Sequence, residues 1–114
     1  MTDFVVGTFI LDFQTVNFEA DSKVALEVLA KLQKECQLEN SFALDDPVKS
    51  AGWSFAKLFF SGQFVEKIYS RYGFEIDGTR GKKFEDRFIS WFGAQLGSKG
   101  CEAQVKMAPE MKSL

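Results

Sequence analysis

This chain of 114 residues contains no histidine. The side chains that remain for acid–base chemistry are tyrosines, carboxylates, basic groups and two cysteines. Histidine is the side chain whose unperturbed pKa lies near neutral pH, and it is the commonest general base and metal ligand. The remaining groups include two tyrosines, Tyr69 and Tyr72, which stand at helical spacing. We expect no catalytic residue set, no cofactor and no metal site.

Two pairs of adjacent carboxylates are the next candidates for acid–base chemistry. They are Asp45-Asp46 and Glu85-Asp86. Adjacent side chains point in different directions on a helix, so neither pair forms a joint site by its spacing alone. Asp46 precedes Pro47, and a carboxylate followed by proline is typical of a helix start.

Cys36 and Cys101 lie far apart in the sequence and do not make a disulfide framework. We expect two thiols in a reducing cytoplasm, with Cys36 on the buried face of a helix. The first residues show no basic segment of the kind that opens a signal peptide. The longest apolar stretch, residues 4–13, is far too short to span a membrane. We therefore expect a cytoplasmic protein with no membrane partner.

The stretch from Ile68 to Ile76 reads IYSRYGFEI. It resembles the helix–glycine–strand unit near the C-terminal end of many acyl-CoA-dependent N-acetyltransferases. The resemblance implies acyl-CoA binding, with Tyr69 as general acid. That family's pyrophosphate loop, Gln/Arg-x-x-Gly-x-Gly/Ala, is matched only by residues 49–54, which depart from it at three defining positions. An acyl-CoA-binding protein centred on Tyr69 is the first alternative function, and we expect no acyl transfer.

A second motif runs from Gly78 to Gly81 and is followed by basic residues. Gly-x-x-Gly with Arg80, Lys82 and Lys83 resembles the nucleic-acid clamp of KH domains. In that family the loop joins two helices directly, whereas a strand is predicted before it here. Acidic residues interrupt the basic cluster, and the net charge of the chain is −2. Nucleic-acid binding through this loop is the second alternative, and we expect no tight binding.

The N-terminal half predicts a strand over residues 4–18 and an amphipathic helix over 21–38, capped by Asp21 or Ser22. In the strand, Phe9, Leu11 and Phe13 share one face, while the other face holds Val6, Ile10 and Val16, and Gly7 marks a bulge or a bend. Residues 46–60 fit two readings. The Asp46-Pro47 start favours a helix, and the alternation from Trp53 to Phe60 allows a strand with a hairpin turn at Ser61-Gly62.

The C-terminal half predicts a helix over 63–72 that ends at Gly73 with a positive φ angle. A strand over 74–78, a helix over 83–96 and a weak strand over 102–107 follow. A flexible tail is expected from about residue 108. The pattern as a whole indicates one α+β domain over residues 1–114, with about four helices packed on a small sheet that includes the N-terminal strand.

The chain contains thirteen phenylalanines, and aromatic residues make up 15% of it. This number exceeds what one buried face of each helix needs, so we expect an aromatic surface for a partner. The predicted function is that of a small non-catalytic binding or regulatory protein, self-associating as a homodimer. The predicted contact residues are Trp53, Phe59, Tyr69, Tyr72, Arg80, Lys82, Lys83 and Trp91.

Overall fold

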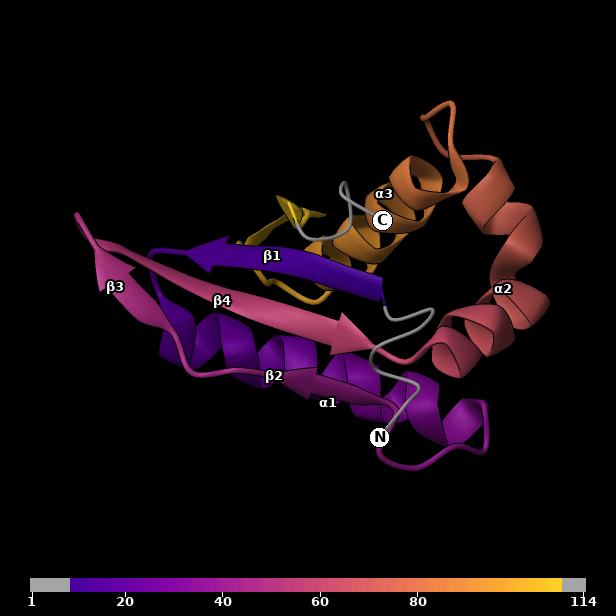
Figure 1. Ribbon diagram of the computed structural model, residues 1–114, viewed down its shortest axis with the longest axis horizontal. Coiled ribbons are helices and arrows are strands. Elements are labelled where there is room, and N and C mark those ends of the chain that lie inside the picture. Colours follow the sequence, from indigo (N-terminus) through magenta and orange to yellow (C-terminus); the bar gives the residue numbers. More distant parts are fainter. Residues whose placement is uncertain (1–8, 110–114) are drawn as a thin grey trace.

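The computed structural model describes residues 9–109 and shows an α+β fold with three helices and a five-stranded antiparallel sheet in that range. The elements are β1 (Phe9–Thr15), α1 (Phe18–Glu35), β2 (Phe42–Leu44), β3 (Val48–Ser50), β4 (Trp53–Phe60), α2 (Gly62–Asp77), α3 (Phe84–Ser98) and β5 (Gln104–Met107) (Figure 1). The predicted fold class and the N-terminal strand in the sheet are confirmed. The prediction of about four helices is wrong by one for these residues.

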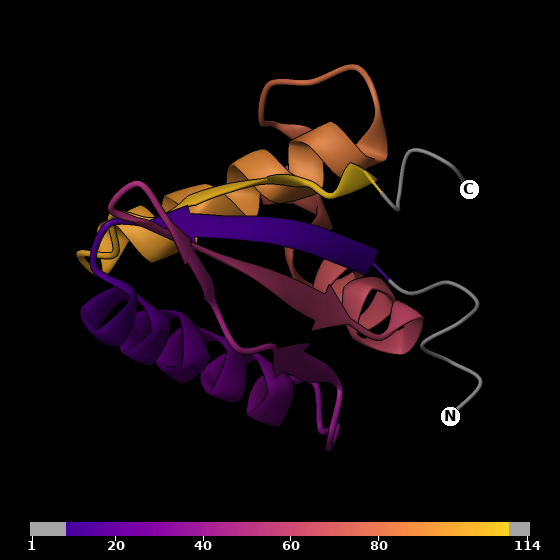
Figure 2. The ribbon, with the colours of Figure 1, turned by 60° about the vertical axis from the view of Figure 1, so that its left-hand side comes forward.

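Strand β4 lies at the centre of the sheet. It pairs with β1 along seven residues on one side, and with β2 and β3 at opposite ends of its other side. Strand β5 pairs with the outer edge of β1. The sheet is therefore four strands wide, with its outermost position on one side shared by β2 and β3 (Figure 2).

The core lies between the sheet and the helices. Alternate residues of β1 and β4 are buried on this side: Phe9, Leu11, Phe13, Ala56, Leu58 and Phe60. Phe60 is the centre of the aromatic packing, since its ring lies 5.6 Å from that of Phe64 in α2 and 5.3 Å from that of Phe92 in α3. From α1, Ala25 and Leu29 complete the same cluster. The predicted face of Phe9, Leu11 and Phe13 is confirmed as the buried one.

Residues 46–60 are not a helix, so that prediction is wrong, and the strand reading holds over Trp53–Phe60. The reason is long-range pairing: β1 supplies a hydrogen-bonding partner along most of β4, and alternation buries every second side chain. The predicted hairpin turn at Ser61-Gly62 is wrong as well. The turn lies at Ala51 and Gly52, which both have positive φ angles, while the Ser61 side chain caps α2 by accepting from the Phe64 N–H.

Helix α2 continues past Gly73 to Asp77, which overturns the predicted helix end and the predicted strand over 74–78. The backbone departs from helical angles at Tyr72 (φ −121°, ψ 17°) and then resumes. Gly73 is not among the residues with positive φ. Ile76, two turns after Ile68, is fully buried like Ile68, so core packing carries the helix through the kink. Phe74 lies on the other side and is 96% exposed.

The remaining boundaries differ from the predictions by a few residues. Helix α1 begins at Phe18, because the Asn17 side chain accepts from the Ala20 N–H and caps it; Asp21, a predicted cap, is buried instead. Ala108, at the start of the predicted tail, is buried, and its N–H donates to the carbonyl of Ile10 at 3.1 Å. Val6 and Gly7 lie outside the described residues.

None of the helices that the structure describes combines the length and the apolar character needed to cross a membrane.

Candidate functional site

The side of the sheet opposite the described helices is the first candidate surface. We call it the open sheet face. The strand registers place the following side chains on it: Ile10, Asp12 and Gln14 of β1, Ala43 of β2, Val48 and Ser50 of β3, Trp53, Phe55, Lys57 and Phe59 of β4, and Gln104 and Lys106 of β5. These side chains are exposed or partly exposed, whereas their neighbours along β1 and β4 are buried. This face mixes large apolar side chains with charges.

The apolar part of the open sheet face follows β4. Phe59 lies opposite Ile10 of β1, and Phe55 lies opposite Val48 of β3. Val48 is 68% exposed and Phe55 is 38% exposed. Trp53 stands at the start of the same strand and is partly exposed. Exposed side chains of this size gathered on one face are typical of an interaction surface.

The charged part is a row that crosses the middle of the sheet. Asp12 of β1 lies opposite Lys57 of β4, and their side chains form an ion pair of 2.6 Å. Lys106 of β5 lies opposite Asp12 on its other side. At the far edge, the Asp45 N–H donates to the Lys57 carbonyl, and the Asp45 carboxylate accepts from the Lys57 N–H. The order across the sheet, Asp45, Lys57, Asp12 and Lys106, therefore alternates in sign.

A hollow of about 310 Å³ lies beside this row, at the bend between β2 and β3. Its lining residues are Asp12, Gln14, Asp45, Asp46, Val48, Phe55, Ala56 and Lys57. The hollow gathers three carboxylates, but Asp12 and Asp45 are already bonded to Lys57. Within residues 9–109, no group of three or more acidic or cysteine side chains is arranged to hold a metal ion.

The structure divides the predicted contact residues among separate places. Trp53 and Phe59 lie together on the open sheet face. Trp91 is 3% exposed and belongs to the core, where its ring lies 5.2 Å from that of Tyr72 in α2. Arg80, Lys82 and Lys83 are exposed in the connection between α2 and α3. They are far from β4 in the fold (Figure 1).

The hydroxyl groups of Tyr69 and Tyr72 both donate hydrogen bonds to carboxylates of the same chain. The Tyr69 hydroxyl donates to Asp77 at 2.6 Å, and this hydrogen bond is the main cause that raises the pKa of Tyr69 above its ordinary value. The Tyr72 hydroxyl donates to Glu35 at 2.6 Å, which likewise raises the pKa of Tyr72. A general acid that must release its proton near neutral pH needs the opposite shift. The hydrogen bond of Tyr69 thus lies within α2, whereas that of Tyr72 joins α2 to α1.

The segments that resemble the acetyltransferase unit and the KH-domain loop can be compared with the local structure that each of them has. The segment that resembles the acetyltransferase unit lies within α2, with a kink at Tyr72, and residues 49–54 form the β3–β4 hairpin instead of a phosphate loop. The Gly78–Gly81 loop does join two helices, contrary to the predicted strand before it. The carbonyls of Gly81 and of Lys82, the residue after the loop, accept from the Arg87 guanidinium of α3.

Sequence reasoning missed Asp12, Lys57 and Lys106 as candidate site residues, and it considered Asp45 only as a member of a carboxylate pair. The alternation of β4 is visible in the sequence. The pairing of its residues with those of a neighbouring strand depends on the register, and the register cannot be read from the sequence. Comparisons of the chain with protein-family models, with curated proteins and with solved structures return no match.

Proposed function

We propose that this protein is a small non-catalytic binding or regulatory protein of the cytoplasm that forms a homodimer through the open sheet face. The observation that carries the proposal is the alternating row of Asp45, Lys57, Asp12 and Lys106 across the sheet. If a second copy of this row is placed against the first in the opposite order, every charge faces a charge of the opposite sign. Two buried free thiols suit the reducing compartment.

The symmetry of the dimer follows from the row. A twofold axis parallel to the strands, between β1 and β4, turns one open sheet face onto the other and reverses the order of the charges. Lys106 of each copy then faces Asp45 of its partner, and Lys57 faces Asp12. Every opposed pair is of opposite sign, which is the self-complementarity that a closed twofold interface requires.

The same axis brings the apolar residues together. Ile10 and Phe59 stand at one level of the sheet, on the two strands that flank the axis. Each copy's Phe59 therefore packs against the partner's Ile10. Sheets stacked in this way lie about 10 Å apart and cross at about 30°, and that spacing suits side chains of this size.

The expected strength follows from the size of the face. Four strand positions at about 4.8 Å and about seven residues at about 3.3 Å give a footprint of roughly 450 Å² for each copy. The two copies together bury roughly 900 Å², below the size of a standard stable interface of about 1,600 Å². We therefore expect a reversible dimer with a dissociation constant in the micromolar range.

Charge reversal tests this arrangement. Lys106→Glu places like charges opposite each other at both ends of the row, and so does Asp45→Lys. We expect each variant alone to be a monomer by sedimentation at concentrations where the unaltered protein is a dimer. An equimolar mixture of the two variants restores opposite signs and should dimerise again.

The matched control is Lys23→Glu, which makes the same charge change on the exposed side of α1. It should leave dimerisation unchanged. A monomeric unaltered protein across the micromolar range would overturn the proposal. So would a dimer that persists in Lys106→Glu, or a mixture of the two charge variants that stays monomeric.

A further inference from the structure

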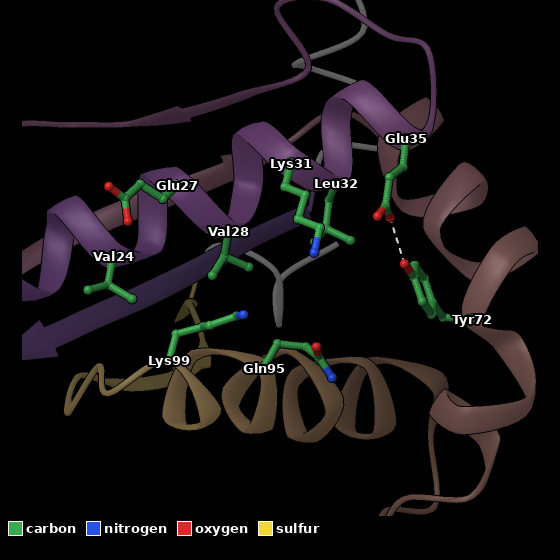
Figure 3. Close-up of a pocket in the computed structure, with 9 residues that line it drawn as sticks. All are labelled: Val24, Glu27, Val28, Lys31, Leu32, Glu35, Tyr72, Gln95 and Lys99. Atoms are coloured by element: carbon green, nitrogen blue, oxygen red, sulfur yellow. Dashed lines mark hydrogen bonds between the residues drawn. The ribbon is translucent and has the colours of Figure 1, made fainter.

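A groove of about 330 Å³ lies on the other side of the molecule, between α1 and α3, and is closed at one end by α2. Its lining residues are Val24, Glu27, Val28, Lys31, Leu32, Glu35, Tyr72, Gln95 and Lys99 (Figure 3). The volume is at the lower end of the range of small-molecule sites. The groove shares no residue with the open sheet face.

One wall of the groove is apolar. Val24, Val28 and Leu32 follow one another at intervals of one helical turn along α1, and Figure 3 shows all three pointing into the groove. Val24 and Val28 are only partly buried although they pack against the core. This wall is therefore apolar surface left open between two helices.

The polar groups of the groove come from the facing helices. Lys31 of α1 and Lys99, which caps α3, both extend into the space between the helices, and the Gln95 amide points there from α3 (Figure 3). Among residues 9–109, no carboxylate lies within ion-pair distance of either ammonium group. The methylene stems of lysines can pack along apolar surface while their charges stay free to bind.

The two carboxylates of the groove do not neutralise these lysines. Glu35 accepts from the Tyr72 hydroxyl and lies 4.0 Å from the Arg71 guanidinium. Glu27 is directed along α1, away from both ammonium groups (Figure 3). The centre of the groove thus offers two unpaired cations and an amide donor beside an apolar wall.

We infer that this groove binds a small carboxylate with an apolar tail. The carboxylate lies between Lys31 and Lys99 and accepts from the Gln95 amide, since hydrogen bonds between ammonium groups and carboxylates are among the stronger ones. The tail lies along Val24, Val28 and Leu32. A neutral molecule would leave both cations without a partner, and a cationic one would be repelled.

Decanoate is the probe, titrated into the protein by calorimetry, with decanol and decyltrimethylammonium as probes of the same chain length. We expect saturable binding of decanoate, and affinity at least tenfold lower for the other two. Lys31→Gln combined with Lys99→Gln should weaken decanoate binding by about tenfold or more, equivalent to about 1.4 kcal/mol. The control Lys23→Gln combined with Lys34→Gln removes two exposed charges elsewhere on α1 and should change nothing.

The tail is tested separately by Val28→Ser, which should weaken decanoate binding without changing the preference for an anion. Thermal melting of each variant checks that it folds. Lys106→Glu should bind decanoate as the unaltered protein does, because the groove lies away from the proposed dimer face. Absence of saturable binding would overturn the inference. Equal binding of decanol, or undiminished decanoate binding in the double lysine variant, would overturn it too.

Discussion

Asp21 and Glu102 are 81 residues apart in the sequence, and the Glu102 N–H donates to the Asp21 carboxylate at 3.1 Å. The other carboxylate oxygen accepts from the Thr15 hydroxyl. Asp21 is 5% exposed, so one buried carboxylate ties the start of α1 both to the end of β1 and to the segment that leads into β5. This carboxylate therefore connects an N-terminal and a C-terminal segment of the described residues.

Asp21→Ala should be the more damaging of two substitutions at this site. It leaves the Thr15 hydroxyl and the Glu102 N–H without their buried acceptor, and we expect a loss of about 3 kcal/mol in the free energy of unfolding. Asp21→Asn keeps one acceptor for Glu102 and can donate to Thr15, so about 1 kcal/mol is expected. Urea denaturation measures both, with the exposed Glu39→Ala as control. Equal losses in the two Asp21 variants would contradict this account.

Ala51→Asn should stabilise the protein. Ala51 and Gly52 form the β3–β4 turn with φ angles of 53° and 84°. An alanine in the left-handed region is strained, whereas asparagine followed by glycine is the preferred pair for such a hairpin turn. We expect a gain of about 0.5–1 kcal/mol by urea denaturation. A loss of stability would mean that the turn does not have this geometry in solution.

Two glycines of the C-terminal half should respond to alanine in opposite ways. Gly81 has a φ of 135°, and a Cβ there would lie 2.6 Å from the Cβ of Asp86. Gly81→Ala should therefore cost about 2 kcal/mol or more. Gly97 lies inside α3 with nothing within 4 Å of an added Cβ, so Gly97→Ala should gain about 0.5–1 kcal/mol from helix propensity. Thermal unfolding of the pair compares the two directly.

Stability should fall at alkaline pH. Burial raises the pKa of the Cys36 and Cys101 thiols, and hydrogen bonds to Asp77 and Glu35 raise the pKa of Tyr69 and of Tyr72. A raised pKa in the folded state means that the folded protein holds the proton more tightly. The stabilisation is thus complete below the unfolded values, about 9 for thiols and 10 for tyrosines, and is lost above them.

Urea denaturation at a series of pH values from 7.5 to 11, taken in steps of about half a unit, measures this loss. We expect little contribution from these four groups to any change below about pH 9 and a decline above it. Tyr72→Phe removes one of the groups, so its decline above about pH 10 should be shallower. An identical slope in Tyr72→Phe would show that the Glu35 hydrogen bond does not shift the titration.

Local pattern alone determined much of this protein. The alternation of Phe9, Leu11 and Phe13 identified the buried face of β1, and the helical spacing of apolar residues identified an amphipathic helix where the structure has α1. Both signals work because side chains repeat every two residues in a strand and about every 3.6 in a helix. A residue's own neighbours in the sequence are enough to reveal them.

Only the tertiary structure decided the rest. Residues 53–60 carried a helical reading as well as an alternating one, and pairing with β1, whose residues lie 39 to 51 positions earlier than their partners, selected the strand. Burial of Ile76 likewise carried α2 past Gly73. The charge row from Asp45 to Lys106 exists only through the registers of four neighbouring strands, and the groove only through the approach of α3 to α1. Contacts between distant segments determine the charge row and the groove. The free energy of these contacts comes from burial and strand pairing, which no local stretch of sequence contains.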